Sequence, residues 1–302
     1  MICSVCIATY KRPTLLEQTL ASILAQVLPH DIIIETIVVD NDPERSAAGI
    51  VEKHHDTDSI SFKYFSQPIK NISLTRNMAV HNASGTYLVL IDDDEVASPR
   101  WIATLLKAAD KYGADGVFGP VLPIFDKSAP EWLVRGERLF VGTIPATPTG
   151  SPATFTWSGN CLLKNSVLTG VSGPFDPSYG ITGGEDTELF DRLRRGGARF
   201  IYCNEAPVFE HWPAARTRKS YLIKVSLKGG NSYTWRKIAA SRWRILKRAL
   251  FLLKGLCVGA LSVCLIIGTL PSKVWRTYWE LKFASNAGGL LAVFGHHYEA
   301  YK

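Results

Sequence analysis

The 302-residue chain carries 34 Lys and Arg residues against 27 Asp and Glu residues, a formal net charge of +7. Hydrophobic residues make up 46% and charged residues 20% of the chain, which excludes a largely disordered or collagen-like protein. Residues 1–210 hold 18 basic and 25 acidic side chains, whereas residues 211–302 hold 16 basic side chains and only Glu280 and Glu299. The basic character therefore belongs to the last third of the chain, and the rest is acidic.

The six cysteines are too few and too scattered to form a disulfide scaffold. Cys3 and Cys6 have C-x-x-C spacing, but they lie in an apolar strand-like run, where positions i and i+3 point to opposite faces. No second Cys/His pair follows, so we do not expect a zinc or redox site there. The N-terminal MICSVCIA lacks the pattern of an export signal, and we expect the main domain in a reducing cytoplasm.

Apolar runs alternate with helical patterns through the first 120 residues. The sequence predicts strands at 2–8, 32–39, 62–65, 87–91 and 116–122, and helices at 14–27, 46–54, 73–82 and 101–112. Thr14-x-x-Glu17 has the spacing of a capping box at the start of the first helix. Strands that alternate with helices indicate βαβ units, so we expect a doubly wound α/β domain with a mostly parallel sheet.

The middle of the chain has a weaker pattern. Residues 120–152 are rich in Pro, Gly and Thr, and we expect a long loop or lid there. Residues 155–164 and 199–203 are typical of strands, and 186–195 of a short helix that ends at Gly196-Gly197.

The acidic run Asp92-Asp93-Asp94-Glu95 directly follows the predicted strand 87–91. Ligands of open parallel sheets bind beyond the carboxyl ends of the strands, which is where this run falls. Adjacent carboxylates repel one another unless a cation neutralises them, and their oxygens suit Mg²⁺ or Mn²⁺. We therefore favour a metal–phosphate site over a solvated acidic turn.

Three further positions are candidates for binding or catalysis. Asp40 ends another predicted strand and could bind a base or ribose, or could form an Asx turn. Glu185 and Asp186 follow Gly183-Gly184, and either carboxylate could act as a general base or simply begin a helix. His211 alone is more often structural than a ligand.

Taken together, these motifs resemble family 2 glycosyltransferases, which have the GT-A fold. The motifs are Ala8-Thr9-Tyr10-Lys11-Arg12-Pro13, Val38-Val39-Asp40, Thr75-Arg76-Asn77, Asp92-Asp93-Asp94 and Gly184-Glu185-Asp186, in the order seen in that family. The resemblance covers about residues 1–215. The remainder, with His211-Trp212-Pro213 and Lys228-Gly229-Gly230-Asn231-Ser232, is similar to the bacterial exopolysaccharide subgroup of the succinoglycan-assembly type.

The resemblance implies a role for each matching residue. The residues that it assigns to donor binding are Ala8, Tyr10, Arg12, Asp40, Arg76 and Asp92. It places Asp94, with Asp92 and His211, at a divalent Mn²⁺ or Mg²⁺ ion. Asp186 matches the general base and Glu185 an acceptor-binding partner. The implied reaction is an inverting transfer from a nucleotide sugar, such as a UDP-sugar, to a polyprenyl-diphosphate-linked saccharide.

The basic tail, residues 216–302, indicates a helical membrane-associating segment rather than a nucleic-acid partner. Within the apolar segment 249–272, residues 255–272 lack any charge, which is about 27 Å of helix against roughly 30 Å of bilayer hydrocarbon. Basic residues flank both ends, which favours an in-plane or re-entrant anchor over a crossing, with a buried soluble helix as a third alternative. We expect attachment to the anionic inner face of a bacterial membrane.

Two other classes of function remain as alternatives. One is a non-catalytic nucleotide-sugar-binding or scaffold protein of a polysaccharide assembly complex. The other is a membrane-linked nucleic-acid-binding protein, suggested by the aromatic residues interleaved with basic ones in the tail.

Overall fold

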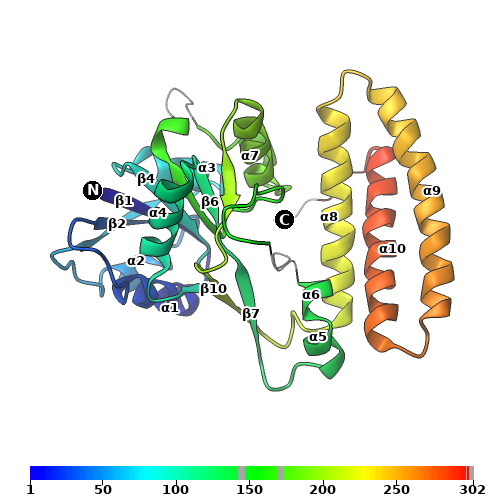
Figure 1. Cartoon of the computed structure of the whole chain (residues 1–302), viewed down its shortest axis with the longest axis horizontal. Coiled ribbons are helices and arrows are strands. Elements are labelled where there is room, and N and C mark those ends of the chain that lie inside the picture. The colour runs from blue at the N-terminus through cyan, green and yellow to red at the C-terminus, as the bar shows by residue number, and fades with distance from the viewer. Residues whose placement is uncertain (142–146, 169–172, 297, 299–302) are drawn as a thin grey trace. The chain divides into compact units, whose positions relative to one another are not determined.

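The computed structural model describes residues 1–141, 147–168, 173–296 and 298 (Figure 1). The chain divides into two compact units. The first unit contains Met1–Pro123 and Thr143–His211, and the second contains Ile124–Gly142 and Trp212–Lys302. A segment from the middle of the sequence thus groups with the C-terminal helices.

The first unit is built on a seven-stranded sheet with the strand order β3-β2-β1-β4-β8-β6-β9. Strand β8 is antiparallel to both of its neighbours, and every other pairing in this sheet is parallel. The strands are β1 (Ile2–Thr9), β2 (Ile33–Asp40), β3 (Ile60–Ser66), β4 (Tyr87–Ile91), β6 (Gly116–Phe118), β8 (Asn160–Lys164) and β9 (Phe200–Tyr202). A smaller sheet has the order β5-β10-β7, formed by β5 (Glu95–Ala97), β10 (Val208–Trp212) and β7 (Val121–Phe125).

Helices cover both faces of the large sheet. One core packs β1 against α1 (Pro13–Leu24), α2 (Ala48–Val51) and α4 (Trp101–Tyr112). The other core packs the opposite face against α3 (Ile72–His81) and α7 (Glu185–Arg195). Two short 3₁₀ helices, η1 (Asn165–Leu168) and η2 (Pro177–Tyr179), lie in the connections. These three layers confirm the doubly wound α/β fold predicted from the sequence.

The two N-terminal cysteines lie on opposite faces of β1, as expected. Cys3 belongs to the first core and Cys6 to the second. Burial raises the pKa of the Cys3 thiol to about 12, with the nearby Glu35 charge adding to the effect. Cys3 therefore stays a neutral thiol at physiological pH and packs as a small apolar side chain.

Two local predictions in this unit were wrong. Helix α1 begins at Pro13 and no side chain caps it, so the predicted capping box at Thr14 is absent. The predicted strand 116–122 is divided by Gly119-Pro120 into β6 and β7, which belong to different sheets. A side chain at Gly119 would lie 2.3 Å from the Ala206 carbonyl oxygen, so the backbone passes too closely there for any other residue.

The second unit is helical. Its helices are α5 (Glu131–Arg135), α6 (Glu137–Phe140), α8 (Lys219–Ala239), α9 (Arg244–Gly268) and α10 (Lys273–Val293). Trp132 and Leu133 of α5 share a core with Trp212, Leu222 and Leu281. The predicted loop at residues 120–152 therefore contains a strand and two short helices, while its residues 142–146 lie outside the described part of the chain.

Glycines allow α8 and α10 to pack closely. A Cβ atom at Gly230 would lie 1.8 Å from the Ser285 carbonyl oxygen, and one at Gly288 would lie 1.9 Å from the Leu227 carbonyl oxygen. The buried Asn231 side chain donates to the Gly288 carbonyl at 3.0 Å and to the His296 carbonyl at 2.8 Å. These contacts bind the end of α10 to the middle of α8.

Candidate functional site

The candidate site lies where β1 and β4 pair at the centre of the large sheet. The strand order proceeds outward from β1 through β2 to β3 in one direction and from β4 in the other, so this pair is the topological switch point. Loops leave the carboxyl ends of two adjacent strands in opposite directions at such a point and leave a crevice between them. The loop after β1 carries Tyr10 and Arg12, and the loop after β4 carries the acidic run.

The acidic loop is held by hydrogen bonds from three directions. The Asp92 backbone N–H donates to the Glu95 carboxylate at 2.9 Å, which closes the turn. Thr9 Oγ1 donates to Asp93 Oδ2 at 2.8 Å, and Arg12 donates to Asp93 and Asp94 at 3.0 Å each. As a result, the side chains of Asp93 and Asp94 are buried, whereas that of Asp92 is 44% exposed.

Burial and the neighbouring carboxylates destabilise the ionised form of two side chains in this loop. Burial raises the pKa of Asp93 to about 6, with Arg12 opposing the rise and the Asp94 charge adding to it. Burial, together with the charge of Asp92, raises the pKa of Glu95 well above its usual range. A further cation at this loop would therefore relieve repulsion that the protein itself leaves in place.

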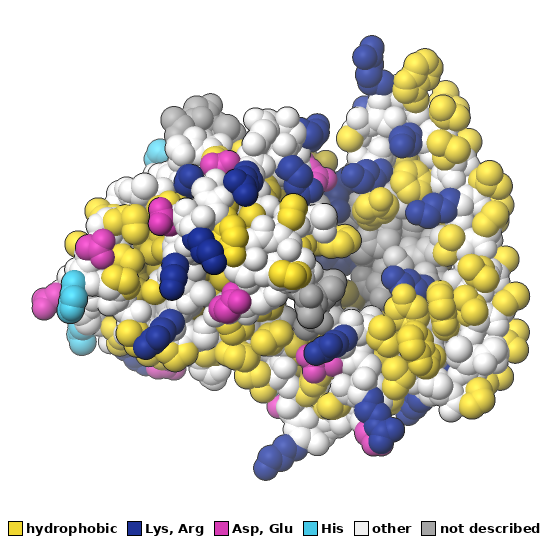
Figure 2. All heavy atoms as spheres, viewed as in Figure 1, with side chains coloured by type: hydrophobic (Ala, Val, Ile, Leu, Met, Phe, Trp, Pro, Cys, Tyr) yellow, Lys and Arg dark blue, Asp and Glu magenta, His cyan; other side chains and the backbone are white. Residues whose placement is uncertain are grey.

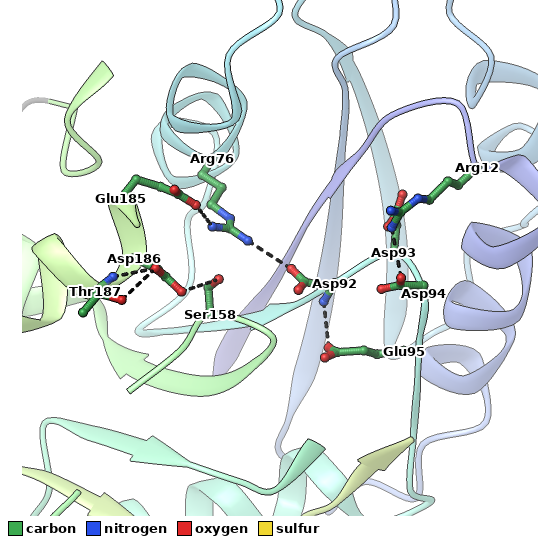
Figure 3. Close-up of polar contacts among 10 residues, drawn as sticks. All are labelled: Arg12, Arg76, Asp92, Asp93, Asp94, Glu95, Ser158, Glu185, Asp186 and Thr187. Atoms are coloured by element: carbon green, nitrogen blue, oxygen red, sulfur yellow. Dashed lines mark hydrogen bonds and ion pairs between the residues drawn. The ribbon is translucent and has the colours of Figure 1, made fainter. Parts of the chain in front are cut away.

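Arg76 on α3 connects the acidic loop to the start of α7 (Figure 3). Its guanidinium donates to Asp92 Oδ1 at 3.0 Å and also forms an ion pair with Glu185. The Arg76 side chain is 12% exposed and lies 5.8 Å from the centre of the Phe175 ring. The neighbouring Asn77 exchanges two hydrogen bonds with the Phe175 backbone, at 2.7 and 2.8 Å, which fixes this loop against α3.

The Gly-Gly-Glu-Asp motif begins α7 through a left-handed turn. Gly183 and Gly184 have φ values of 76° and 94°, a conformation that strongly favours glycine. This turn directs the two carboxylates differently. Glu185 is buried against Arg76, and burial raises its pKa. Its Oε2 atom is buried and has no hydrogen-bond partner within the described ranges.

Asp186 lies half-buried beside Glu185. Its Oδ1 atom accepts a hydrogen bond from the Thr187 backbone N–H at 2.6 Å, and its Oδ2 atom lies 3.5 Å from the Ser158 hydroxyl (Figure 3). Ser158 did not stand out in the sequence, because a single serine before a strand carries no recognisable pattern. It is 3% exposed and belongs to the site through the fold alone.

Three of the predicted donor-binding residues line one cavity, whereas Tyr10 is exposed at the surface. Ala8, Arg76 and Asp92 line one small cavity of about 10 Å³ together with Ser158. Tyr10 is 40% exposed, and the ammonium groups of Lys11 and Lys70 lie 5.7 and 5.9 Å from the centre of its ring.

Asp40 is fully buried, unlike the other predicted donor-binding residues, and it accepts hydrogen bonds within the first unit. Its side chain is fully buried, and its oxygens accept from Asp42 N at 2.9 Å, Ala47 N at 2.8 Å and the Tyr64 hydroxyl at 3.2 Å. The bond from Asp42 N is an Asx turn, the alternative that the sequence left open. Asp40 thus holds the loop after β2 in its present conformation.

His211 lies on β10, whose register pairs Glu210 with Glu95 of β5. The ladder ends at this pair, and because His211 follows Glu210 while Asp94 precedes Glu95, both residues lie at the same end of the ladder. Across the described residues, however, no three His, Cys, Asp or Glu side chains come together as a group that could hold a metal ion. Asp92, Asp94 and His211 therefore do not form a complete ligand set by themselves.

The acidic loop nevertheless suits a divalent cation chemically. It offers carboxylate oxygens, the donors that Mg²⁺ and Mn²⁺ prefer, and burial and mutual repulsion destabilise the ionised form of Asp93 and Glu95, which a cation would favour. Mg²⁺ is typically held by one or two carboxylates plus substrate phosphates rather than by a full protein cage. The residues present therefore fit a cation that is shared with a phosphate-bearing ligand.

The fold also matches known structures. The Staphylococcus aureus TarS 1-349 structure in complex with UDP has a TM-score of 0.56 at 14% identity, covering 99% of this chain and 93% of that one. The structure of GalNAc-T7 with UDP, GalNAc and Mn²⁺ has a TM-score of 0.55 at 16% identity, covering 80% of this chain and 51% of that one. At these identities the likeness concerns the fold, which confirms the GT-A architecture.

Sequence comparison is more specific. The succinoglycan biosynthesis protein ExoM of Rhizobium meliloti (strain 1021) is 31% identical over 294 residues, which cover 96% of this chain and 92% of ExoM. The family model for glycosyl transferase family 2 matches residues 4–170, a range that includes the loops after β1 and β4, and Arg76. The chain is therefore an enzyme of glycosyl transferase family 2.

Proposed function

We propose that this enzyme transfers a sugar from a UDP-sugar to a lipid-linked saccharide, with inversion, in the biosynthesis of a bacterial exopolysaccharide or cell-surface polysaccharide. The name of the ExoM relative supports the polysaccharide class, and the UDP in the TarS and GalNAc-T7 structures supports the donor class. The observation that carries the proposal is the position of Arg76, which binds both the acidic loop and the Glu185-Asp186 pair. One side chain thereby links a candidate phosphate site to a candidate base.

In the proposed reaction, an acceptor hydroxyl attacks the anomeric carbon as the bond from that carbon to the diphosphate oxygen breaks. The attacking hydroxyl loses its proton to the Asp186 carboxylate, and the nucleoside diphosphate leaves on the opposite side of the sugar. Asp186 suits the base because it is half-buried and accessible, and Ser158 and Thr187 orient its carboxylate. Glu185 lies beside Asp186 and is the proposed acceptor-binding partner, since its Oε2 atom has no hydrogen-bond partner among the described residues and an acceptor hydroxyl that reached it would supply one.

The remaining residues would bind the donor. Arg12 and Arg76 carry the positive charge that a diphosphate needs, and Tyr10 offers an exposed ring against which a base can stack. Ala8 lines the small cavity beside Asp92, next to which the proposed ribose would bind. Asp40 would contact the base only if its present hydrogen bonds to the loop after β2 rearrange.

Asp94 is the proposed principal cation ligand, with Asp92 and His211 as further ligands. A bound Mn²⁺ or Mg²⁺ would stabilise the negative charge that develops on the leaving diphosphate. Arg12 now pairs with the Asp94 carboxylate, and it is 43% exposed, so it can turn toward solvent or toward phosphate.

The second unit supports attachment to a membrane surface. Among the described residues, α9 is the one helix long and apolar enough to cross a membrane, and only 11% of its most apolar window is buried. This exposure disagrees with the alternative of a helix buried in a soluble fold. Helix α10 packs along α9 and carries Lys273, Arg276, Glu280 and Lys282, charges that a crossing hairpin would bring into hydrocarbon. We therefore favour an in-plane anchor at the cytoplasmic face of the inner membrane.

The catalytic proposal is tested by measuring sugar transfer with Mn²⁺ or Mg²⁺ for Asp186→Asn and Asp94→Asn. We expect each substitution to lower kcat by about 10²- to 10⁴-fold, because each removes a group that acts in the transition state. Asp191→Asn, on the same helix as Asp186, is the matched control and should leave activity unchanged, since that side chain pairs only with Arg194 in the described structure. Full activity of both site variants would refute the assignment, and a wild-type protein without donor turnover would favour a scaffold role.

A further inference from the structure

A cavity of about 220 Å³ lies among α8, α9 and α10. Its charged lining residues are two lysines, Lys254 from α9 and Lys282 from α10, and no carboxylate lines it. Thr234, Ser285 and Asn286 add polar groups, while Phe251, Val258 and Leu290 form apolar walls. The cavity therefore combines positive charge, hydrogen-bonding groups and apolar surface within one site.

Among the described residues, both lysines lack a carboxylate partner. The Lys282 ammonium lies 5.2 Å from the centre of the Tyr278 ring. Glu280, two residues before Lys282 on α10, forms ion pairs with Lys219 and Arg276 instead. The site thus keeps two positive charges available to an anionic ligand.

The cavity adjoins the exposed apolar surface of α9. At 100° per residue, the positions that form this apolar face span about 160° of the helix circumference, and none of them is charged. The large side chains of the apolar face are 45–87% exposed and comprise Ile245, Leu246, Leu250, Leu253, Leu256, Leu261, Val263 and Ile267. Figure 2 shows hydrophobic side chains in yellow along the edge that α9 forms.

Lys254 marks the border between the apolar face and the cavity. Viewed down the helix axis, Lys254 lies between Leu261 of the apolar face on one side and Val258 and Phe251 on the other side. Val258 and Phe251 line the cavity. Lys254 is also the last charged residue before Gly255–Gly268, which contain none. Long lysine side chains at such a border reach the headgroup layer while their stems lie on hydrocarbon.

We propose that this cavity binds the anionic phosphate group of a lipid, with Lys254 and Lys282 contacting the phosphate and the lipid chain lying along the apolar face. The proposal rests on the membrane attachment proposed above. The volume of about 220 Å³ is several times the roughly 30 Å³ share of a water molecule, so it accommodates a phosphate with its adjoining group. A phospholipid headgroup and the diphosphate of an isoprenoid-linked saccharide share this chemistry.

The test measures binding of the full-length enzyme to phosphatidylcholine vesicles that contain a minor fraction of one anionic lipid. The three anionic lipids are phosphatidylglycerol, a polyprenyl diphosphate, and oleate, which carries charge without phosphate. The variants are Lys254→Gln and Lys282→Gln, and Lys247→Gln is the matched control because it is exposed on α9 outside the cavity.

We expect Lys254→Gln and Lys282→Gln each to weaken binding to a phosphate lipid by about tenfold, through loss of a charge-assisted hydrogen bond. Their effect on oleate vesicles should be no larger than that of Lys247→Gln. The phosphate lipid that shows the larger lysine-dependent loss identifies the source of the phosphate. Equal losses in all three variants, or equal losses with oleate and phosphate lipids, would overturn the proposal, because either result indicates general surface attraction.

Two further measurements separate this proposal from those on which it rests. Binding of the wild-type enzyme to vesicles of phosphatidylcholine alone reports on the apolar face, and absence of binding to every vesicle, with or without anionic lipid, would refute membrane attachment itself. Donor hydrolysis by the same lysine variants should stay at the wild-type rate, because neither lysine lies in the first unit. Folded, active variants with unchanged phosphate-lipid binding would refute the cavity site alone.

Discussion

The two units differ in which side chains they bury: the first buries charged side chains at its candidate site, and the second exposes apolar side chains on α9. In the first unit, Asp93, Asp94, Glu95 and Glu185 are buried at the candidate site, and apolar side chains fill two cores. In the second unit, leucines and isoleucines of α9 are exposed, and the basic residues lie at their border. Buried carboxylates require cations nearby, whereas exposed leucines require an apolar surface to cover them. Each unit is therefore completed by a different kind of partner.

The strongest test of this contrast is Arg76→Gln. Arg76 neutralises two carboxylates while only 12% exposed, and removal of one partner from a buried ion pair costs about 3–5 kcal/mol. We expect the free energy of unfolding in urea to fall by about that amount and sugar transfer to fall at least about 100-fold. If the loss arises from the unpaired carboxylate, adding Glu185→Gln should restore part of the stability but not the activity.

Arg12→Gln is the matched control for Arg76→Gln. Arg12 also binds two carboxylates, but it is 43% exposed, and exposed ion pairs contribute about 0–1 kcal/mol. A similar loss of stability in both variants would contradict the view that burial makes Arg76 the structural link of the site.

A second test concerns the packing of α8 against α10. Gly230→Ala places a methyl group against the Ser285 backbone and should lower the free energy of unfolding by about 2–3 kcal/mol. Its neighbour Gly229 has no atom within 4 Å of the corresponding position. Gly229→Ala should therefore stabilise the helix by about 0.5–1 kcal/mol. Thermal unfolding of both variants would show opposite signs, and equal signs would exclude this packing arrangement.

Much of the first unit follows from local sequence. Buried parallel strands are continuous apolar runs, so β1, β2 and β4 were recognisable, and the acidic run after β4 marked the site. The residues that complete the site were harder to predict, because they depend on distant contacts. The Arg76–Glu185 ion pair joins positions 109 residues apart, and Ser158 reaches Asp186 across 28 residues.

The segment at residues 124–141 shows the same limit. Its helices α5 and α6 are only one turn long, too short for a hydrophobic period to be visible. They are ordered by packing against Trp212, Leu222 and Leu281, which lie far along the chain. The composition, rich in Pro and Gly, therefore predicts a loop, whereas tertiary contacts form two short helices that pack into the core of the second unit.

A third test uses Glu35, a buried carboxylate outside the site. Unlike Glu185, it accepts hydrogen bonds at both of its oxygens. Burial alone would raise the pKa of Glu35, but hydrogen bonds from Lys63, Ser4 and Ser84 outweigh it and lower the pKa to about 2. A lowered pKa stabilises the folded state above the unfolded value near 4.5, and this contribution is lost as the pH falls toward 2. Glu35→Gln should cost about 2–3 kcal/mol at pH 7.

The pH dependence distinguishes this interpretation from a loss of packing. Urea unfolding of the wild type and Glu35→Gln should give free energies that converge as the pH falls from about 4.5 toward 2. A difference that stays constant over this range would mean that the ionised carboxylate is not the source of the stability.

The smallest expected effect concerns the apolar face of α9. Leu256 is 59% exposed, so Leu256→Ser should change the free energy of unfolding by less than about 0.5 kcal/mol. In contact with lipid, the same leucine would be worth about 1.5 kcal/mol, and its loss should weaken vesicle binding roughly tenfold. Val27→Ser, at a similarly exposed position in the first unit, should leave vesicle binding unchanged. Equal binding of Leu256→Ser and wild type would mean that α9 is covered by something other than lipid.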